Sequence, residues 1–248
     1  CAEGRDDLCG PFFDLNRIQG RLYDGETRLF DLDGTPIAMY SMGGLAQYCV
    51  IPSTSVAPLP DSIDPVAGAV RRGADLRHGE AVAVVATGGV GSNIIQISRA
   101  FGAKQVIAID VADDKLEAAR ALGATDTVNS TKQDVHETVF ALTGGRGVDV
   151  AFEALGRPQT WTSALDALRD GGRMVPIGLG AGVQTAQVEI NRTVRRSQSI
   201  IGSYGARTRQ DLPEVVRLAA EGTIRYQDIV TRRFALEDVA QGYELLRQ

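Results

Sequence analysis

Cysteine is scarce in this sequence, and long apolar runs are absent from it. Three cysteines in 248 residues are too few for a disulfide framework, so we expect a reducing, cytoplasmic setting. No run of about 18 apolar residues appears, so no membrane-spanning helix is expected. No charged-then-apolar leader opens the chain either, and we therefore expect no secretion signal.

An excess of positive charge is also lacking. The formal net charge is -5 and the pI is near 5.2, which argues against a protein whose main partner is nucleic acid or an anionic membrane. Pairs of arginines do occur at 71–72, 195–196 and 232–233. Because no aromatic residues alternate with them, they are more typical of solvated faces or partners of carboxylates.

The most informative stretch is residues 81–96, an apolar run that stops at a glycine cluster and then resumes with helical spacing. This pattern predicts a buried parallel strand, a tight turn and a helix. The glycines follow Ala86-x-Gly88-x-x-Gly91, with alanine at the first position of the usual dinucleotide motif. Amides at the helix start attract anions, so the candidate pyrophosphate-binding residues are Thr87, Gly88, Gly89, Val90 and Gly91.

A second apolar strand, residues 106–110, ends on Asp110, which lies 19 residues after Gly91. This is close to the spacing of the acid that binds an adenosine ribose. Such an acid favours NAD, because the 2′-phosphate of NADP would meet a like charge. A glycine turn and a strand-end aspartate in a sheet protein without a cofactor remain the alternative.

Strands and helices alternate through the rest of this region. Strands are expected at residues 125–128, 148–153 and 173–178, and helices at 113–122, 133–142 and 158–168. The rhythm predicts a doubly wound parallel sheet that binds its ligand at the carboxyl ends of the strands. Since the first and fourth strands of such a sheet adjoin, Thr87 and Ala154 should flank the cofactor, and Gly178 should lie beside its nicotinamide half.

The first 60 residues read as β-rich, with short strands expected at residues 27–30, 36–40 and 46–51. Cys1 and Cys9 are either half of a four-thiolate zinc site or two unrelated loop cysteines. Cys49 is predicted to be a buried strand residue. A capped helix at residues 61–70 runs abruptly into Arg71, so we expect residues to be absent near Val70 and Arg71, and both chain ends look cut.

Further on, the sequence predicts a strand at residues 199–203 and a helix at 211–221. Residues 193–203 are either an edge strand used for dimerisation or an ordinary edge protected by charge.

Taken together, the motifs resemble the zinc-containing medium-chain alcohol dehydrogenase family of the MDR superfamily, over essentially the whole chain. The resemblance rests on Cys1-x7-Cys9, Thr87-Gly88-Gly89-Val90-Gly91, Asp110 with Asp113-Asp114-Lys115, Leu122-Gly123-Ala124-Thr125-Asp126, Gly145-x-Gly147-Val148-Asp149 and Phe152-Glu153. They occur in the order and spacing of that family.

The resemblance implies an NAD-binding Rossmann domain at residues 71–204. Residues 1–70 would be an incomplete β-rich, GroES-like catalytic domain, to which residues 205–248 return. Cys1 and Cys9 would be the third and fourth thiolates of a structural zinc lobe, and Lys115 would help to hold the adenosine ribose. The residues that resemble the lining of the nicotinamide pocket are Ala154, Leu155, Ile177, Gly178 and Leu179.

This resemblance predicts a zinc-dependent oxidoreductase that transfers hydride between an alcohol, aldehyde or ketone and NAD, as a homodimer or homotetramer. The chain departs from the family because the residues expected to hold the catalytic zinc are absent from it. Two alternatives follow, an NAD-binding fragment without turnover and a zinc-free quinone or enone reductase of the same superfold. Cys1-x7-Cys9 and Asp110 argue against the reductase.

Overall fold

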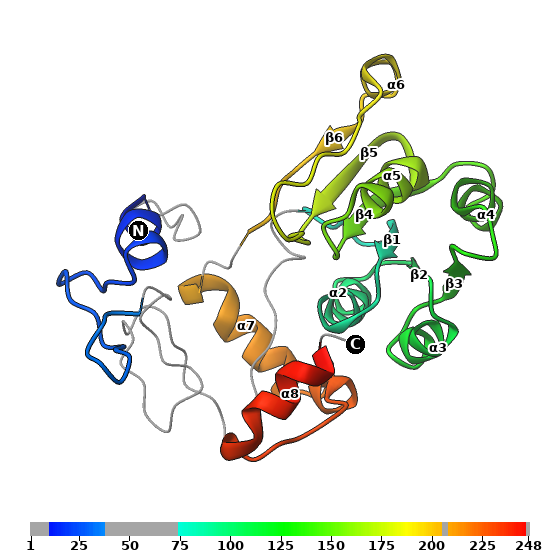
Figure 1. Ribbon diagram of the computed structural model, residues 1–248. Coiled ribbons are helices and arrows are strands. Elements are labelled where there is room, and N and C mark those ends of the chain that lie inside the picture. Colours follow the sequence, from blue (N-terminus) through cyan, green and yellow to red (C-terminus); the bar gives the residue numbers. More distant parts are fainter. Residues whose placement is uncertain (1–9, 38–73, 205–207, 247–248) are drawn as a thin grey trace. The chain divides into compact units, whose positions relative to one another are not determined.

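The computed structural model describes residues 10–37, 74–204 and 208–246 (Figure 1). Contacts divide the chain into two compact units. One contains residues 1–58, 206–213 and 230–248, and the other contains residues 59–205 and 214–229. In the described ranges no helix is both long and apolar enough to cross a membrane.

The second unit is built on a six-stranded sheet in which every ladder is parallel. Its strands are β1 (Ala81–Val85), β2 (Gln105–Asp110), β3 (Asp126–Asn129), β4 (Val148–Glu153), β5 (Leu168–Pro176) and β6 (Ser199–Ile200). The order is β3-β2-β1-β4-β5-β6. The predicted doubly wound sheet is confirmed, including the pairing of the first strand with the fourth.

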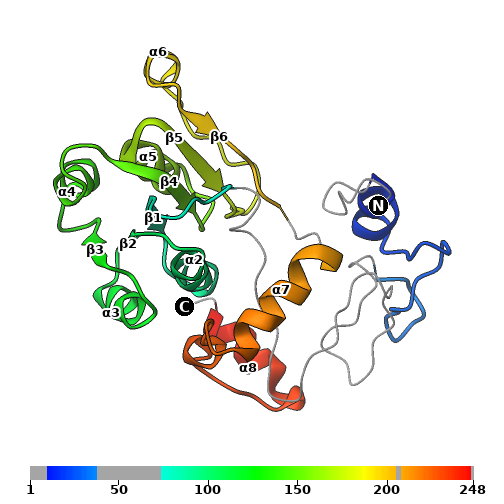
Figure 2. The same ribbon diagram turned by 180° about the vertical axis from the view of Figure 1, so that it is seen from behind.

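Helices lie on both faces of this sheet, as the two views in Figures 1 and 2 show. They are α2 (Gly89–Ala100), α3 (Asp113–Ala121), α4 (Val135–Leu142) and α5 (Pro158–Ala167). The short helix α6 (Ile190–Arg195) precedes β6 in the chain. One face of the central strands, with Val84 and Phe152, packs with α2 and α3, while the other, with Val85 and Ala151, packs with α5. The central strands are therefore apolar on both faces, which explains their unbroken apolar sequence.

The chain after β6 forms α7 (Thr208–Ala220) and the short helix η4 (Tyr226–Ile229). Leu218 and Ile224 from this segment join the core on the α2 side of the sheet. The backbone N–H of Arg225 donates to the Gln96 side chain of α2 at 2.7 Å. These contacts attach residues 214–229 to the second unit.

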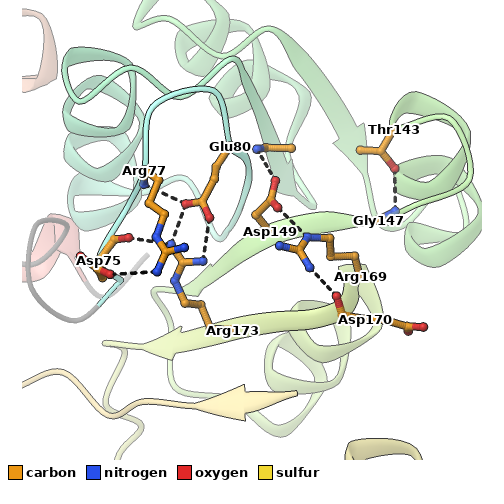
Figure 3. Close-up of polar contacts among 10 residues, drawn as sticks. Asp75, Arg77, Glu80, Thr143, Gly147, Asp149, Arg169, Asp170 and Arg173 are labelled. Atoms are coloured by element: carbon orange, nitrogen blue, oxygen red, sulfur yellow. Dashed lines mark hydrogen bonds and ion pairs between the residues drawn. The ribbon is translucent and has the colours of Figure 1, made fainter. Parts of the chain in front are cut away.

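The amino edge of the sheet is held by ion pairs (Figure 3). Glu80, which precedes β1, makes two hydrogen bonds with Arg173 of β5, at 2.9 and 2.6 Å. Asp149 of β4 pairs with Arg169 at 2.5 Å and accepts from the backbone N–H of Ala81 at 2.7 Å. Burial raises the pKa of Asp149, but the bonds from Ala81 and Arg169 outweigh it and hold that pKa below its ordinary value of 3.8.

We expected β5 to begin at residue 173, but it begins at Leu168. The ladder between β4 and β5 is irregular in this stretch. Val148 pairs with Leu168, whereas Val150 pairs with Arg173. The extra residues include Gly171, whose φ is +69°. The strand therefore bulges at its amino end and then pairs regularly with β4, from Arg173 opposite Val150 to Pro176 opposite Glu153.

The described part of the first unit has less regular structure than expected. A π-helix, η2 (Phe12–Ile18), lies near its start, and the strand predicted at 27–30 is reduced to one bridge, between Phe30 and Pro36. Residues 38–40 of the second predicted strand lie outside the described ranges. Leu32 in the connecting turn is fully exposed, so this hairpin has little apolar surface to bury. The unit ends in η5 (Leu236–Asp238) and α8 (Val239–Leu246).

Several predictions fall on residues outside the described ranges. They concern Cys1, Cys9, Cys49, the strand at 46–51, the helix at 61–70 and the junction of Val70 and Arg71.

Candidate functional site

The turn between β1 and α2 leaves a helix start without a cap. Gly88 is the N-cap residue, no side-chain cap accepts from the N–H groups of the first turn, and that turn contains no acidic residue. The first N–H groups of a helix have no acceptor within the helix, and they carry the positive end of the helix dipole. The start of α2 can therefore bind an anion.

The glycines of this turn have two different functions. A Cβ at Gly91 would lie 2.1 Å from the carbonyl oxygen of Ala86, so Gly91 permits the close packing of α2 against the end of β1. At Gly88 and Gly89 a Cβ would meet nothing within 4 Å. These two glycines border open space from which a ligand can approach the backbone.

Ala86 takes a backbone conformation that normally favours glycine. Its φ is +70°, in the left-handed region that costs an L-residue about 1 to 2 kcal/mol. The alanine at the first motif position is therefore tolerated under strain.

Asp110, at the end of β2, organises the turn. It is 7% exposed, and its Oδ2 accepts from the backbone N–H of Thr87 at 2.7 Å and from the Thr87 hydroxyl at 3.1 Å. Its Oδ1 accepts from the backbone N–H groups of Val111 at 2.8 Å and Ala112 at 3.2 Å. A carboxylate has about four acceptor positions, so the protein itself uses all of them.

Glu153 lies at the end of β4, on the other side of β1 from Asp110, and holds a loop in the same way. It is fully buried, and its Oε1 accepts from the N–H groups of Leu155 and Gly156, each at 2.8 Å, and from the Thr160 hydroxyl at 2.7 Å. This carboxylate fixes the loop that follows β4. This role of Glu153 was not predicted from the sequence, although an acidic residue at the end of a strand was a signal for it.

The loops after β4 and β5 touch each other through their backbones. A Cβ at Gly156 would lie 2.3 Å from the N atom of Gly180, and a Cβ at Gly178 would lie 2.2 Å from the N atom of Gly156. The φ of Gly156 is +79°. A cavity of about 490 Å³ adjoins this contact, and its walls include Gly156, Trp161 and Leu179.

The predicted cofactor-binding residues all lie at the carboxyl edge of the sheet or on the helices that start there. Ala154 and Ile177 pack against the core, whereas Lys115 is an exposed residue of α3. Apolar side chains are exposed at the same edge, with exposed fractions of 50% for Val90, 61% for Val111, 43% for Leu155 and 71% for Leu179. Sequence reasoning missed Val111, for which the signal was an apolar residue directly after Asp110.

No metal centre is found in the described part of the chain. Among those residues, no group of three or more His, Cys, Asp and Glu side chains is placed to hold a metal ion. The described residues therefore do not fit a zinc site, and Cys1 and Cys9 lie outside them.

Residues 89–221 match the family model of the zinc-binding dehydrogenases, and these residues make up more than half of the chain. The chain belongs to the zinc-binding dehydrogenase family. Its family segment begins at the first residue of α2 and contains the loops after β2, β4 and β5.

Individual relatives agree with this assignment. The chain is 28% identical over 218 residues to an L-threonine 3-dehydrogenase of Chromobacterium violaceum, which covers 84% of this chain and 63% of that protein. It is 31% identical to a Catharanthus roseus protein described as a CYP enzymes assisting alcohol dehydrogenase, over all of this chain and 71% of that one.

Among solved structures, an alcohol dehydrogenase zinc-binding domain protein from Burkholderia ambifaria matches with a TM-score of 0.89 and 28% identity. The match covers 98% of this chain and 70% of that one. The chain spans only 61% to 63% of the length of three L-threonine 3-dehydrogenases that it matches.

Proposed function

We propose that this zinc-binding dehydrogenase chain binds NAD at the carboxyl edge of its sheet. The pyrophosphate would lie at the start of α2, against the backbone of Gly88 and Gly89. The observation that carries the proposal is this uncapped helix start beside open space. The Thr87 bond to Asp110 supports it, because it fixes the turn before any ligand arrives.

The adenosine half would lie beside Asp110, Val111 and Lys115. Because all acceptor positions of Asp110 are used, a ribose hydroxyl must replace one existing donor. The Thr87 hydroxyl makes one of the longer bonds and is free to rotate, so we assign the exchange to it. The Asp110 carboxylate would repel a 2′-phosphate, which favours NAD over NADP.

The nicotinamide half would lie over the loops after β4 and β5. Ala154, Leu155, Ile177, Gly178 and Leu179 belong to these loops, and the apolar exposed surface of Leu155 and Leu179 suits a flat ring. The bonds from Leu155 and Gly156 to Glu153 hold the first of these loops in place. This arrangement fixes one face of the ring against the protein.

For the whole protein we propose hydride transfer between an alcohol and NAD. Zinc, when bound, would act as a Lewis acid on the alcohol. The described residues supply no zinc ligands, and their part in the reaction is to position the cofactor. Cys1 and Cys9 are proposed ligands of a structural zinc, a proposal that metal analysis of the purified protein with and without both thiols tests.

The sharpest test compares Asp110→Asn with Asp149→Asn, the same substitution at opposite edges of the sheet. NADH binding is measured by calorimetric titration, with ADP-ribose as competitor and circular dichroism as the check on folding. We expect Asp110→Asn to weaken NADH binding at least about tenfold, the loss of roughly one charged hydrogen bond, and Asp149→Asn to leave it unchanged. Absence of NADH binding in folded wild-type protein would overturn the proposal.

We also propose that the molecule assembles through β6. This strand pairs with β5 at the edge of the sheet, and Ile200 and Ile201 are each 38% exposed there. Sedimentation should show a dimer or tetramer that Ile200→Lys dissociates. A monomeric wild type would contradict this proposal without affecting NAD binding.

A further inference from the structure

A second concave site lies among α4, α5 and α6, and it shares no residue with the proposed dinucleotide site. Its volume is about 570 Å³, within the range of small-molecule pockets. It is lined by His136, Asp166, Glu189, Arg192, Arg195 and Arg196. Three arginines therefore face two carboxylates around one cavity.

Two guanidinium nitrogens at this cavity are buried without a hydrogen-bond partner. They are Nη2 of Arg192 and Nη1 of Arg196. Each arginine uses only part of its donor set, because Nη1 of Arg192 pairs with Asp166 and Nε of Arg196 lies 3.4 Å from Asp170. A buried cationic N–H without an acceptor costs free energy, so both nitrogens favour an anionic ligand.

The cavity lining also includes acceptors. Nδ1 of His136 lies 2.8 Å from the carbonyl oxygen of Asp166. Because a carbonyl only accepts, Nδ1 carries a proton and donates, which leaves Nε2 as the ring nitrogen available to a ligand. The ring contacts Phe140 with centroids 4.2 Å apart, which fixes its orientation. Glu189 adds a carboxylate to the same lining.

We propose that this cavity binds a phosphate-bearing small molecule. One guanidinium group is enough to bind a single carboxylate. Here the guanidinium groups of Arg192 and Arg196 each keep an unpartnered nitrogen, and Arg195 adds a third positive charge. A phosphate group has three strong acceptor oxygens, enough for Arg192 Nη2, Arg196 Nη1 and Arg195 together. The hydroxyl groups of the same molecule would donate to His136 and Glu189.

Inorganic phosphate is the probe for the test, with sodium chloride at matched ionic strength as the control. The readout is taken at His136, which lines the cavity, so phosphate bound at the start of α2 does not contribute to it. The chain contains 2 histidines, so His78 serves as an internal reference for His136 in a proton NMR titration. We expect phosphate to shift the His136 ring signals and leave those of His78 in place.

Arg192→Gln and Arg196→Gln are tested singly and combined, and Arg217→Gln is the control. Arg217 is an exposed arginine of α7 that pairs with Glu221, away from the cavity lining. We expect each single variant to weaken phosphate binding about tenfold, the double variant to abolish it, and Arg217→Gln to bind as wild type.

Phosphate binding that is unchanged in the double variant, or a response equal to that of sodium chloride, would overturn the proposal. If the double variant does not fold, Arg195→Gln replaces it, because Arg195 makes no ion pair among the described residues and its loss removes charge alone. Failure of NAD binding would leave this result interpretable, since the NMR readout is local to His136.

Discussion

The two edges of the parallel sheet use carboxylates in opposite ways. At the amino edge, Glu80 and Asp149 pair with Arg173 and Arg169. At the carboxyl edge, Asp110 and Glu153 are more deeply buried and accept only from N–H and hydroxyl groups of the loops and helix starts at that edge. An acid paired with an arginine joins two strands, whereas an acid bonded to a loop fixes the loop.

This difference explains why one edge is suited to binding and the other to stability. The ion pairs close the amino edge and leave its charges neutralised. At the carboxyl edge the loops are held while the start of α2 stays uncapped, so its N–H groups remain for a ligand. Variants at the two edges should therefore separate stability from NADH affinity.

The largest expected effect comes from Gly91→Ala. Its Cβ would lie 2.1 Å from the Ala86 carbonyl oxygen, so α2 must move away from β1, at a cost of about 3 kcal/mol in unfolding free energy. Urea denaturation measures this cost. Gly89→Ala is the control, because nothing lies within 4 Å of the new Cβ, and its stability should stay within about 1 kcal/mol of wild type. Equal losses in both variants would contradict the packing role of Gly91.

The next largest loss of stability is expected at the amino edge, from Arg173→Gln. Arg173→Gln leaves Glu80, whose side chain is 12% exposed, without its cation. Breaking a mostly buried pair is strongly destabilising, and we expect a loss of about 2 kcal/mol after allowing for partial exposure. NADH affinity at the far edge should not change. A loss of affinity in a still folded variant would show that the two edges are coupled.

A smaller effect of opposite sign is expected at Ala86. Glycine relieves the strain of φ +70°, worth about 1 to 2 kcal/mol, and costs about 0.5 to 1 kcal/mol of chain entropy. Ala86→Gly should therefore raise the unfolding free energy by about 0.5 kcal/mol, measured by thermal denaturation. A decrease in melting temperature would mean that the alanine side chain makes contacts that outweigh its backbone strain.

The last effect, of the same order as that at Ala86, is the pH dependence contributed by Asp149. Its pKa is lowered in the folded protein, so its contribution is present above the ordinary value of 3.8 and is lost as the pH falls through the lowered value. The stability difference between wild type and Asp149→Asn, at most about 1 kcal/mol, should shrink below pH 3.8. Acid denaturation curves of both proteins give this difference, and a gap that widens in acid would contradict the assignment.

Much of the second unit was predictable because burial leaves a local pattern. The apolar runs of β1, β2 and β4 predicted the strands, and the alternation with helices predicted their order. The early start of β5 was not predictable, since a bulge depends on the register with β4.

Only part of the arrangement of the site could be predicted from the sequence. The glycines and Asp110 were found from their spacing, but the use of every Asp110 acceptor position depends on where the N–H groups of Thr87, Val111 and Ala112 point. The arginine-lined cavity could not be predicted from the sequence, for a similar reason. Arg195 and Arg196 are adjacent in sequence, whereas His136 and Asp166 reach the same cavity from two other helices.

The backbone contact between the loops after β4 and β5 has an evolutionary consequence. Because neither Gly156 nor Gly178 has room for a side chain, each position constrains the other. A related chain with a larger residue at one of them must have rebuilt the opposite loop. We therefore expect the two positions to change together in homologous sequences, and the two loops to shift as one body when the pocket is reshaped.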